Sequence, residues 1–351
     1  MVVVGSDVHK RTHTFVVIDE AGRKLGEITV KASPEGHDKA IRWVRERFGE
    51  DEIVWAIEDC RHLSARLELD LLDAGEQVVR VPPKLMAEQR RTARTRGKSD
   101  PIDALAVARA ALREPDLPVA THDEASRELK LLVDHREDLV RQRTAIINRF
   151  RWHLHRIDPT LDPTPRSLDR AKTRAGLREV LGGLSGIDAR LARELLEDIE
   201  ALTVRANELE REITALVTDR APALLEIPGC GPLTAAKIVG ETAGVDRFAT
   251  EAKYAMHAGV APIPVWSGRT RGRVRMNKSG NRQLNAALHR IAVTQIRSDG
   301  LGRSYYRKRL DAGDSKTEAL RALKRRLARV VFNTLKNDPS NTAATALAAA
   351  A

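Results

Sequence analysis

The chain has 351 residues, of which 60 are Lys or Arg and 49 are Asp or Glu, so its formal net charge is +11 at pH 7. Hydrophobic residues make up 42% of the sequence, which excludes a wholly disordered chain, and two cysteines are too few for a disulfide framework or a cysteine-based zinc site. We identify no signal peptide and no run of about 20 apolar residues that would span a bilayer, so we expect a cytoplasmic protein with an anionic partner and no membrane.

The first part of the chain has the pattern of an α/β domain, which we expect over residues 1–120. Three apolar runs separated by short connections predict a meander of strands, and strands and helices alternate after it. The predicted strands are Val2–Val4, Thr14–Ile18, Leu25–Val30, Ile53–Ile57 and Gln77–Val81, and the predicted helices are Glu35–Phe48, Leu63–Leu72 and a segment from Ser99 to about Leu112.

Four carboxylates stand at the ends of these predicted elements. Asp7 ends the first strand, Glu58 ends the fourth, and Asp100 and Asp103 share one face at a helix start. Carboxylates that converge at one point repel each other unless a hard cation lies among them, and Mg²⁺ bound in this way can clamp a phosphodiester. Each residue also has a plainer interpretation, because Asp7 suits a turn and the pair Asp100 and Asp103 suits a helix start. The four together predict a magnesium site.

Two long helical patterns occupy the middle of the chain. Apolar residues recur with a period near 3.5–3.6 over Glu124–Ile157 and again over Ile187–Val217, and three prolines lie between the two stretches. We therefore expect an arm over residues 121–220. It is either a coiled coil that mediates self-association or a plain helical hairpin within one chain.

A glycine turn between two helical patterns follows the arm. The segment Leu225–Ile238 resembles a helix-hairpin-helix, a module that binds the DNA backbone without sequence preference. Backbone N–H groups around Gly229 and Gly231, with Lys237 on the second helix, would then contact phosphate. The alternative is a simple tight turn between two helices.

Positive charge is concentrated toward the carboxyl end. From Ser267 to Lys336 there are 19 Lys or Arg and 4 Asp or Glu, and a second basic cluster runs from Lys84 to Lys98. Such blocks are typical of contact with nucleic acid, although a solvated charged face is the common alternative. We expect an all-α domain over residues 221–336 and a tail without function over 337–351.

These motifs resemble the DEDD transposases of bacterial insertion sequences of the IS110 type, a family that also contains the Piv-type DNA invertases. The amino-terminal blocks that carry the resemblance are GSDVHK, AIED and KSDPIDA. The resemblance implies a RuvC-like, ribonuclease-H-like fold, in which Asp7, Glu58, Asp100 and Asp103 are the D-E-D-D positions. Lys98, which directly precedes the third block, would contact phosphate.

The same resemblance extends to a carboxy-terminal block from His257 to Leu288, where it implies that Ser267 is a nucleophile. Without the resemblance, Ser267-Gly268 is an ordinary turn, and Ser279 and Ser304 are rival serines. Trp266 is either a core residue or a base-stacking residue. The side chains that would bind nucleic acid or stabilise the attacked phosphate are Arg269, Arg271, Arg273, Arg275, Lys278, Asn281 and Arg282.

The function that the resemblance implies is a DNA transposase or recombinase. It would cut and rejoin donor and target double-stranded DNA through a phosphoserine link, under the direction of a bridge RNA. It would act as a dimer that assembles to a tetramer, in association with the nucleoid. The residues leave open a metal-dependent nuclease or junction resolvase, a DNA invertase without guide RNA, and a non-catalytic nucleic-acid-binding scaffold.

Overall fold

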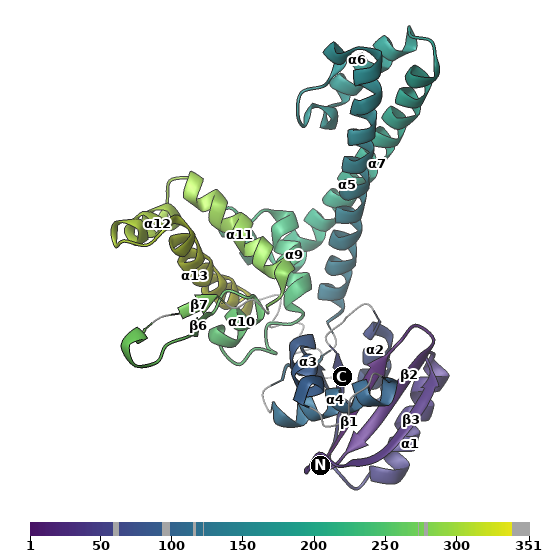
Figure 1. Ribbon diagram of the computed structural model, residues 1–351, viewed down its shortest axis with the longest axis vertical. Helices are drawn as coiled ribbons and strands as arrows, with labels where there is room; N and C mark the ends of the chain where they lie inside the picture. Colours follow the sequence, from purple (N-terminus) through teal and green to yellow (C-terminus); the bar gives the residue numbers. More distant parts are fainter. Residues whose placement is uncertain are drawn as a thin grey trace. The chain divides into compact units, whose positions relative to one another are not determined.

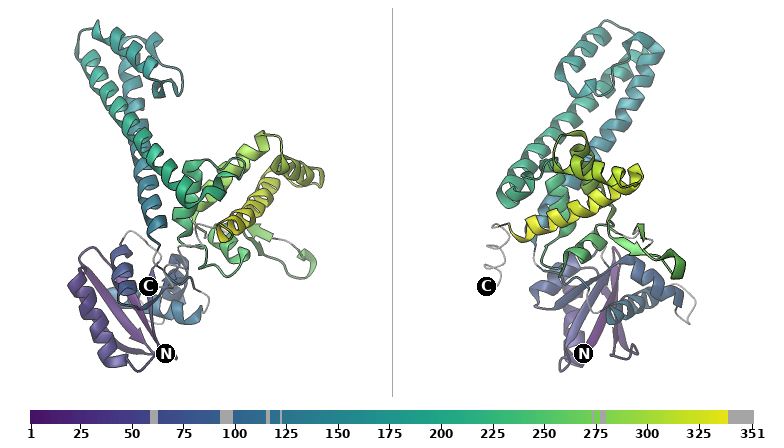
Figure 2. Two further views of the ribbon diagram at one scale, coloured as in Figure 1. Left: turned by 180° about the vertical axis from the view of Figure 1, so that it is seen from behind. Right: turned by 90° about the vertical axis from the view of Figure 1, so that its left-hand side faces the viewer.

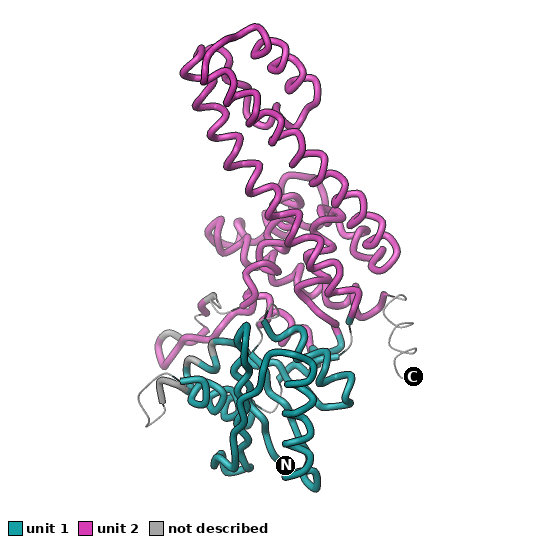
Figure 3. Tube along the Cα trace, turned by 90° about the vertical axis from the view of Figure 1, so that its right-hand side faces the viewer, with its two compact units in different colours: residues 1–123, 246–249 teal, residues 124–245, 250–351 magenta. Residues whose placement is uncertain are grey.

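The computed structural model divides the chain into two compact units (Figures 1 and 3). Unit 1 contains residues 1–123 and 246–249, and unit 2 contains residues 124–245 and 250–351. The finer division of the second unit into an arm and a carboxy-terminal domain stays a prediction. The structure describes residues 1–58, 63–92, 99–114, 117–121, 123–272, 274–276 and 280–338.

A five-stranded sheet with the strand order β3-β2-β1-β4-β5 forms the centre of unit 1. Strands β1 to β3 form the predicted antiparallel meander, and β4 and β5 extend the sheet in parallel on the other side of β1. The first strands are longer than the sequence pattern indicated, because polar residues continue the ladder beyond the apolar runs. The strands are β1 (Val2–Val8), β2 (Thr12–Ile18), β3 (Lys24–Lys31), β4 (Ile53–Glu58) and β5 (Gln77–Val81).

Helices cover both faces of this sheet (Figure 1), which explains the apolar runs of β1, β2 and β4. One face packs on α1 (Pro34–Phe48) and α2 (Ala65–Asp73), and the opposite face packs on α3 (Pro83–Thr92) and α4 (Asp100–Arg113). Helix α3 was not predicted. Gly5 allows α4 to lie directly on β1, because a Cβ at this position would stand 2.2 Å from the carbonyl oxygen of Ala104.

Unit 2 begins with two helices of 34 residues each, α5 (Glu124–Ile157) and α7 (Ile187–Arg220). They pack side by side, as Figure 2 shows, and confirm the two predicted long helices. The connection between them also contains a helix that the sequence pattern did not reveal. This connection contains η1 (Pro159–Leu161), η2 (Ser167–Asp169) and the unpredicted helix α6 (Ala171–Gly182). Phe150, Leu154 and Leu181 are among the buried side chains that join α6 to the long helices.

The remainder of unit 2 is mostly helical, as predicted, but it also contains a two-stranded antiparallel hairpin that was not predicted. The buried aromatic rings of Tyr254 and Phe332 lie 5.8 Å apart in the core of this helical part. No helix among the described residues is long and apolar enough to cross a membrane. The elements are α8 (Pro222–Leu225), α9 (Pro232–Thr242), α10 (Glu251–His257), β6 (Pro262–Pro264), η3 (Gly268–Thr270), β7 (Val274–Met276), α11 (Arg282–Arg297), α12 (Leu301–Asp311) and α13 (Lys316–Lys336).

Candidate metal centre and basic hairpin

Asp7 and Glu58 lie at the same level on neighbouring parallel strands. The register pairs Gly5 of β1 with Ala56 of β4, and each carboxylate follows two residues later on its strand. Because side chains alternate across a sheet, both carboxylates project toward the face that Gly5 and Ala56 share. That face is the one covered by α4.

The first turn of α4 supplies the other two predicted carboxylates. Ser99 is the N-cap residue, and its carbonyl accepts hydrogen bonds from the backbone N–H groups of Ile102 and Asp103 at 2.9 and 3.0 Å. Asp100 therefore lies inside the helix rather than at its cap, and Asp103 is buried one turn later. An acidic first turn also stabilises the helix through its dipole, so the metal-site and helix-start interpretations are compatible.

Three potential ligand groups converge at this end of the sheet. One ligand atom each from Asp7, His9 and Asp100 lies within 4.8 Å of the other two. The imidazole Nε2 of His9 is 3.1 Å from Asp7 Oδ2 and 3.5 Å from Asp100 Oδ1. His9 was not among the predicted site residues, although the spacing Asp-x-His at a strand end was a usable signal.

The electrostatics of Asp7 show that the carboxylates interact. Burial raises the pKa of Asp7, the charge and hydrogen bond of His9 lower it, and the charges of Asp103 and Asp100 raise it again, with a net upward shift. A cation among these groups would offset both the cost of burying the charged Asp7 carboxylate and its repulsion from Asp103 and Asp100. Hard divalent cations prefer such oxygen ligands, so the donor set fits a metal ion of the Mg²⁺ type. Metal binding by the four carboxylates stays a prediction.

Ser267 lies in the loop that connects β6 to β7. The hairpin pairs Ile263 with Arg275 and Pro264 with Val274, and Ser267 is exposed shortly after β6 ends. Arg269, Arg271 and Arg275 are also exposed on this hairpin. Three predicted residues of the same block lie outside the described residues, as do Lys98 and the rest of its basic cluster beyond Thr92. These three are Arg273, Lys278 and Ser279.

The base of this hairpin is held by a close backbone contact and by Asn281. A Cβ on Gly280 would stand 2.1 Å from the backbone nitrogen of Gly259, so only glycine fits this contact. The side-chain oxygen of Asn281 caps α11 by accepting the N–H groups of Gln283 and Leu284. Its amide Nδ2 donates to Glu241 Oε2 at 2.6 Å. These contacts account for Asn281 as a structural residue, whereas Arg282 next to it is exposed.

The structure corrects the expectation that Lys237 contacts phosphate. Its side chain is only 3% exposed, and its Nζ donates to Asp134 Oδ1 at 3.1 Å and Glu137 Oε2 at 3.0 Å. The reason is that α9 packs against α5, which places Lys237 on the inner face of α9. Lys130 continues this cluster by donating to Asp134 and Glu241.

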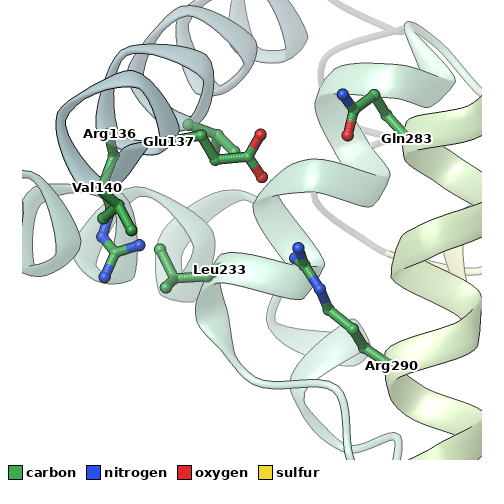
Figure 4. Close-up of a pocket in the computed structure, with 7 residues that line it drawn as sticks. Arg136, Glu137, Val140, Leu233, Gln283 and Arg290 are labelled. Carbon is green, nitrogen blue, oxygen red and sulfur yellow. The ribbon is translucent and has the colours of Figure 1, made fainter. Parts of the chain in front are cut away.

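A pocket of about 370 Å³ adjoins this buried charge cluster. Figure 4 shows Glu137 and Arg290 reaching into it from different helices. Glu137 is already bound to Lys237, and Arg136 of the wall donates to Glu210 and to the carbonyl of Ala206. The charged groups of its α5 wall therefore have partners within the protein.

At the segment predicted as a helix-hairpin-helix, the first helix is very short. Helix α8 is a single turn of four residues, and α9 begins at Pro232 after the turn. Gly229 and Gly231 are exposed in this turn, on either side of the buried Cys230. Their contact with phosphate stays a prediction.

The chain is similar to transposase family models and to proteins of bacterial insertion elements. A family model described as "Transposase", of the DEDD IS110 type, matches residues 4–159, and one described as "Transposase IS116/IS110/IS902 family" matches residues 221–307. The 44.8 kDa protein of insertion element IS116 from Streptomyces clavuligerus is 29% identical, over 95% of this chain and 94% of its own length. The 42 kDa protein of insertion element IS900 from Mycobacterium paratuberculosis is 26% identical, over 99% of this chain and 98% of its own.

The chain resembles a solved structure over only part of its length. The RuvC protein of Thermus thermophilus, in complex with a Holliday junction substrate, is 19% identical with a TM-score of 0.26. The match covers 33% of this chain and 94% of the RuvC chain.

Proposed function

Because the chain belongs to the IS110/IS116 family of DEDD transposases, we propose that it cuts and rejoins DNA strands with two groups of residues. It is thus an enzyme, a DNA transposase. The first group is the carboxylate set Asp7, Glu58, Asp100 and Asp103, and the second is the nucleophile Ser267 with the arginines beside it. Its substrates would be donor and target double-stranded DNA, and it would act in the cytoplasm on the nucleoid.

The observation that supports the first group most directly is the convergence of ligand atoms at one end of the sheet. Asp7, His9 and Asp100 offer ligand atoms within 4.8 Å of each other, and Asp103 is near enough to raise the pKa of Asp7. The carboxylate set indicates dependence on a divalent metal ion, and we propose Mg²⁺. Two such ions, when bound, would stabilise the attacking and leaving oxygens of an in-line displacement at phosphorus. His9 would orient the Asp7 carboxylate through its hydrogen bond.

The second group performs the covalent step of the proposal. Ser267 Oγ loses its proton and bonds to phosphorus, while the bond from phosphorus to the 3′-oxygen breaks and this oxygen becomes a hydroxyl. In the rejoining step, a 3′-hydroxyl of another strand loses its proton and bonds to phosphorus, while the bond from phosphorus to Ser267 Oγ breaks and Oγ becomes a hydroxyl again. The exposed guanidinium groups of Arg269 and Arg271 would neutralise the charge that develops on the phosphate.

Partners and assembly belong to the same proposal. A structured bridge RNA would choose the target by base pairing, while the basic surfaces bind backbone phosphates. Exposed apolar side chains on the long helices, at Leu131, Ile187 and Val204, favour self-association through this arm, as a coiled coil that brings dimers into a tetramer. The carboxylates and the serine would then come from different subunits. DNA inversion without a guide RNA, which a relation to Piv-type invertases would imply, is the alternative outcome for the same chemistry.

The test of the covalent step is denaturing electrophoresis of labelled DNA, after incubation with the full chain, its co-purified nucleic acid and Mg²⁺. Wild-type protein should give a band of protein-linked DNA, and Ser267→Ala should abolish it. Ser304→Ala is the matched control, since Ser304 is an exposed serine on α12 of the same unit. Strand cleavage by wild-type protein without this band would favour the hydrolytic nuclease or junction resolvase.

The test of the metal site uses the carboxylates. Asp7→Asn should abolish cleavage in Mg²⁺ and leave the affinity for nucleic acid nearly unchanged, because the basic surfaces remain. Direct titration of Mg²⁺ into the nucleic-acid-free protein should show weaker binding in the variant. Undiminished cleavage by Asp7→Asn would remove the carboxylate set from the reaction.

A further inference from the structure

Trp266 differs from Trp55 and Trp43 in its surroundings. Trp55 is fully buried, with its Nε1 donating to Glu76 and its ring edge-on to Phe15. Trp43 packs against Phe48 and Arg47. Trp266 is 49% exposed in the loop after β6, and within the described part of the chain its ring has no stacking or hydrogen-bonding partner.

The loop around this ring carries charge of one sign only. Between residues 262 and 282 there are six Lys or Arg and no Asp or Glu. Arg269, Arg271 and Arg275 are exposed, and none of them forms an ion pair with another described residue. On the long helices, by contrast, Arg136 of α5 pairs with Glu210 and Arg220 of α7 pairs with Glu128. Among its described residues, the basic hairpin formed by β6, β7 and the loop between them therefore presents a positive surface without paired carboxylates and with one flat apolar ring in it.

We propose that Trp266 is a stacking platform for one unpaired base of the bound nucleic acid, next to the phosphate that Ser267 attacks. This inference rests on the proposed function and adds the conformation of the substrate at the reacting step. Stacking requires an exposed base face, and in a continuous duplex that face is covered by the neighbouring base pairs. The ring can therefore bind only a nucleotide that is single-stranded or turned out of the helix.

A base stacked on Trp266 would position its own phosphate for attack by Ser267. Trp266 directly precedes Ser267, so a base held on the indole ring fixes the sugar and phosphate of that nucleotide close to the serine hydroxyl. The arginines bind the phosphate as a charge, whereas the ring restricts its orientation. Trp266 is thus a positioning residue, and any base can occupy the platform, since every base has a π-face.

The experiment measures binding, without cleavage, of a short single-stranded oligodeoxynucleotide and of a duplex of the same sequence to the full chain. Trp266→Ala should weaken single-strand binding at least about fivefold and duplex binding hardly at all. Trp266→Phe should keep most of the single-strand affinity but lose part of the quenching of tryptophan emission that accompanies binding. Trp152→Ala is the matched control, because Trp152 is 70% exposed on α5 and does not belong to the basic hairpin, so this variant should keep both affinities.

Two results would overturn the stacking proposal. One is equal single-strand affinity in Trp266→Ala and wild type, and the other is an equal loss for single strand and duplex, which would mean a general effect on the hairpin. Neither depends on whether Ser267 forms a covalent link, since no bond is cut in this assay. Wild-type protein that binds neither oligonucleotide would refute the proposed function and this inference with it.

Discussion

Substitution of Lys237 by methionine tests whether this residue is structural or contacts phosphate. Its side chain is 3% exposed, and its ammonium group binds the carboxylates of Asp134 and Glu137. Burial raises the pKa of Asp134, but hydrogen bonds from Lys130 and Lys237 outweigh burial and keep this pKa below its usual value. Lys237→Met removes one of these two cations and leaves the carboxylates partly buried with less compensation.

The expected cost follows from the geometry of the cluster. Removal of one partner of a buried ion pair costs about 3–5 kcal/mol. Because both carboxylates retain partial access to water, we expect the lower end, about 3 kcal/mol. For a unit of this size, that loss lowers the melting temperature by roughly 6–12 °C.

The assay combines thermal unfolding, followed by circular dichroism, with DNA affinity measured at several salt concentrations well below the melting temperature. Lys237→Met should melt earlier and bind DNA with an unchanged salt dependence. Arg282→Met is the matched control, since it removes one charge from an exposed site at the start of α11 and should leave the melting temperature alone. If Lys237→Met instead melts like wild type while the slope of log affinity against log salt concentration falls by about one, Lys237 contacts phosphate and is not structural.

Three further predictions address other parts of the chain. Burial and the charge of the stacked His37 lower the pKa of His13 to about 4 from 6.5, so the unfolded state takes up the proton first and stability should fall by about 3 kcal/mol as the pH drops from 6.5 to 4. Urea unfolding between pH 6.5 and 4 should show this loss of stability, and in His13→Gln the free energy of unfolding should depend less on pH. The same pH dependence in the variant as in wild type would mean that other groups cause it. Gly280→Ala places a Cβ 2.1 Å from the nitrogen of Gly259, and should cost about 1–3 kcal/mol in thermal unfolding and disturb the hairpin that carries the serine; a variant with wild-type stability and strand joining would show that this contact can relax. If segment 267–336 makes about six phosphate contacts, DNA affinity should fall roughly a thousandfold between about 50 and 200 mM salt, and fluorescence anisotropy that shows little change would contradict this.

The helices and strands of both units could largely be predicted from local sequence patterns. Apolar runs bounded by turns indicated the strands of the meander and the two that follow it, and a helical period indicated α5 and α7 over almost their whole length. Such patterns are local because the alternation of a strand and the turn of a helix repeat within a few residues. The sequence patterns did not predict the helix α6 or the hairpin β6–β7, because α6 has few buried residues and each hairpin strand has only three residues.

The candidate metal site was also accessible from sequence, but only in part. Asp7, Glu58 and Asp100 stand at element ends, and parallel strands bring such ends to one edge of a sheet. That His9 turns toward Asp7 and Asp100 depends on how the chain leaves β1 and where α4 begins. Neither is encoded in the few residues around His9.

Burial and pairing of charged side chains were decided by the tertiary structure alone. Lys237 and Arg282 are both basic residues in a positively charged region, yet one is enclosed by carboxylates of α5 and the other is exposed. Asn281 caps α11 and binds Glu241, forty residues earlier in the chain. The order of the amino acids specifies which positions are basic, apolar or acidic, and hence the local periodic patterns. Which of the basic residues can meet a phosphate depends on helices that are distant in sequence but adjacent in space, because desolvation and ion pairing are properties of the packed surroundings.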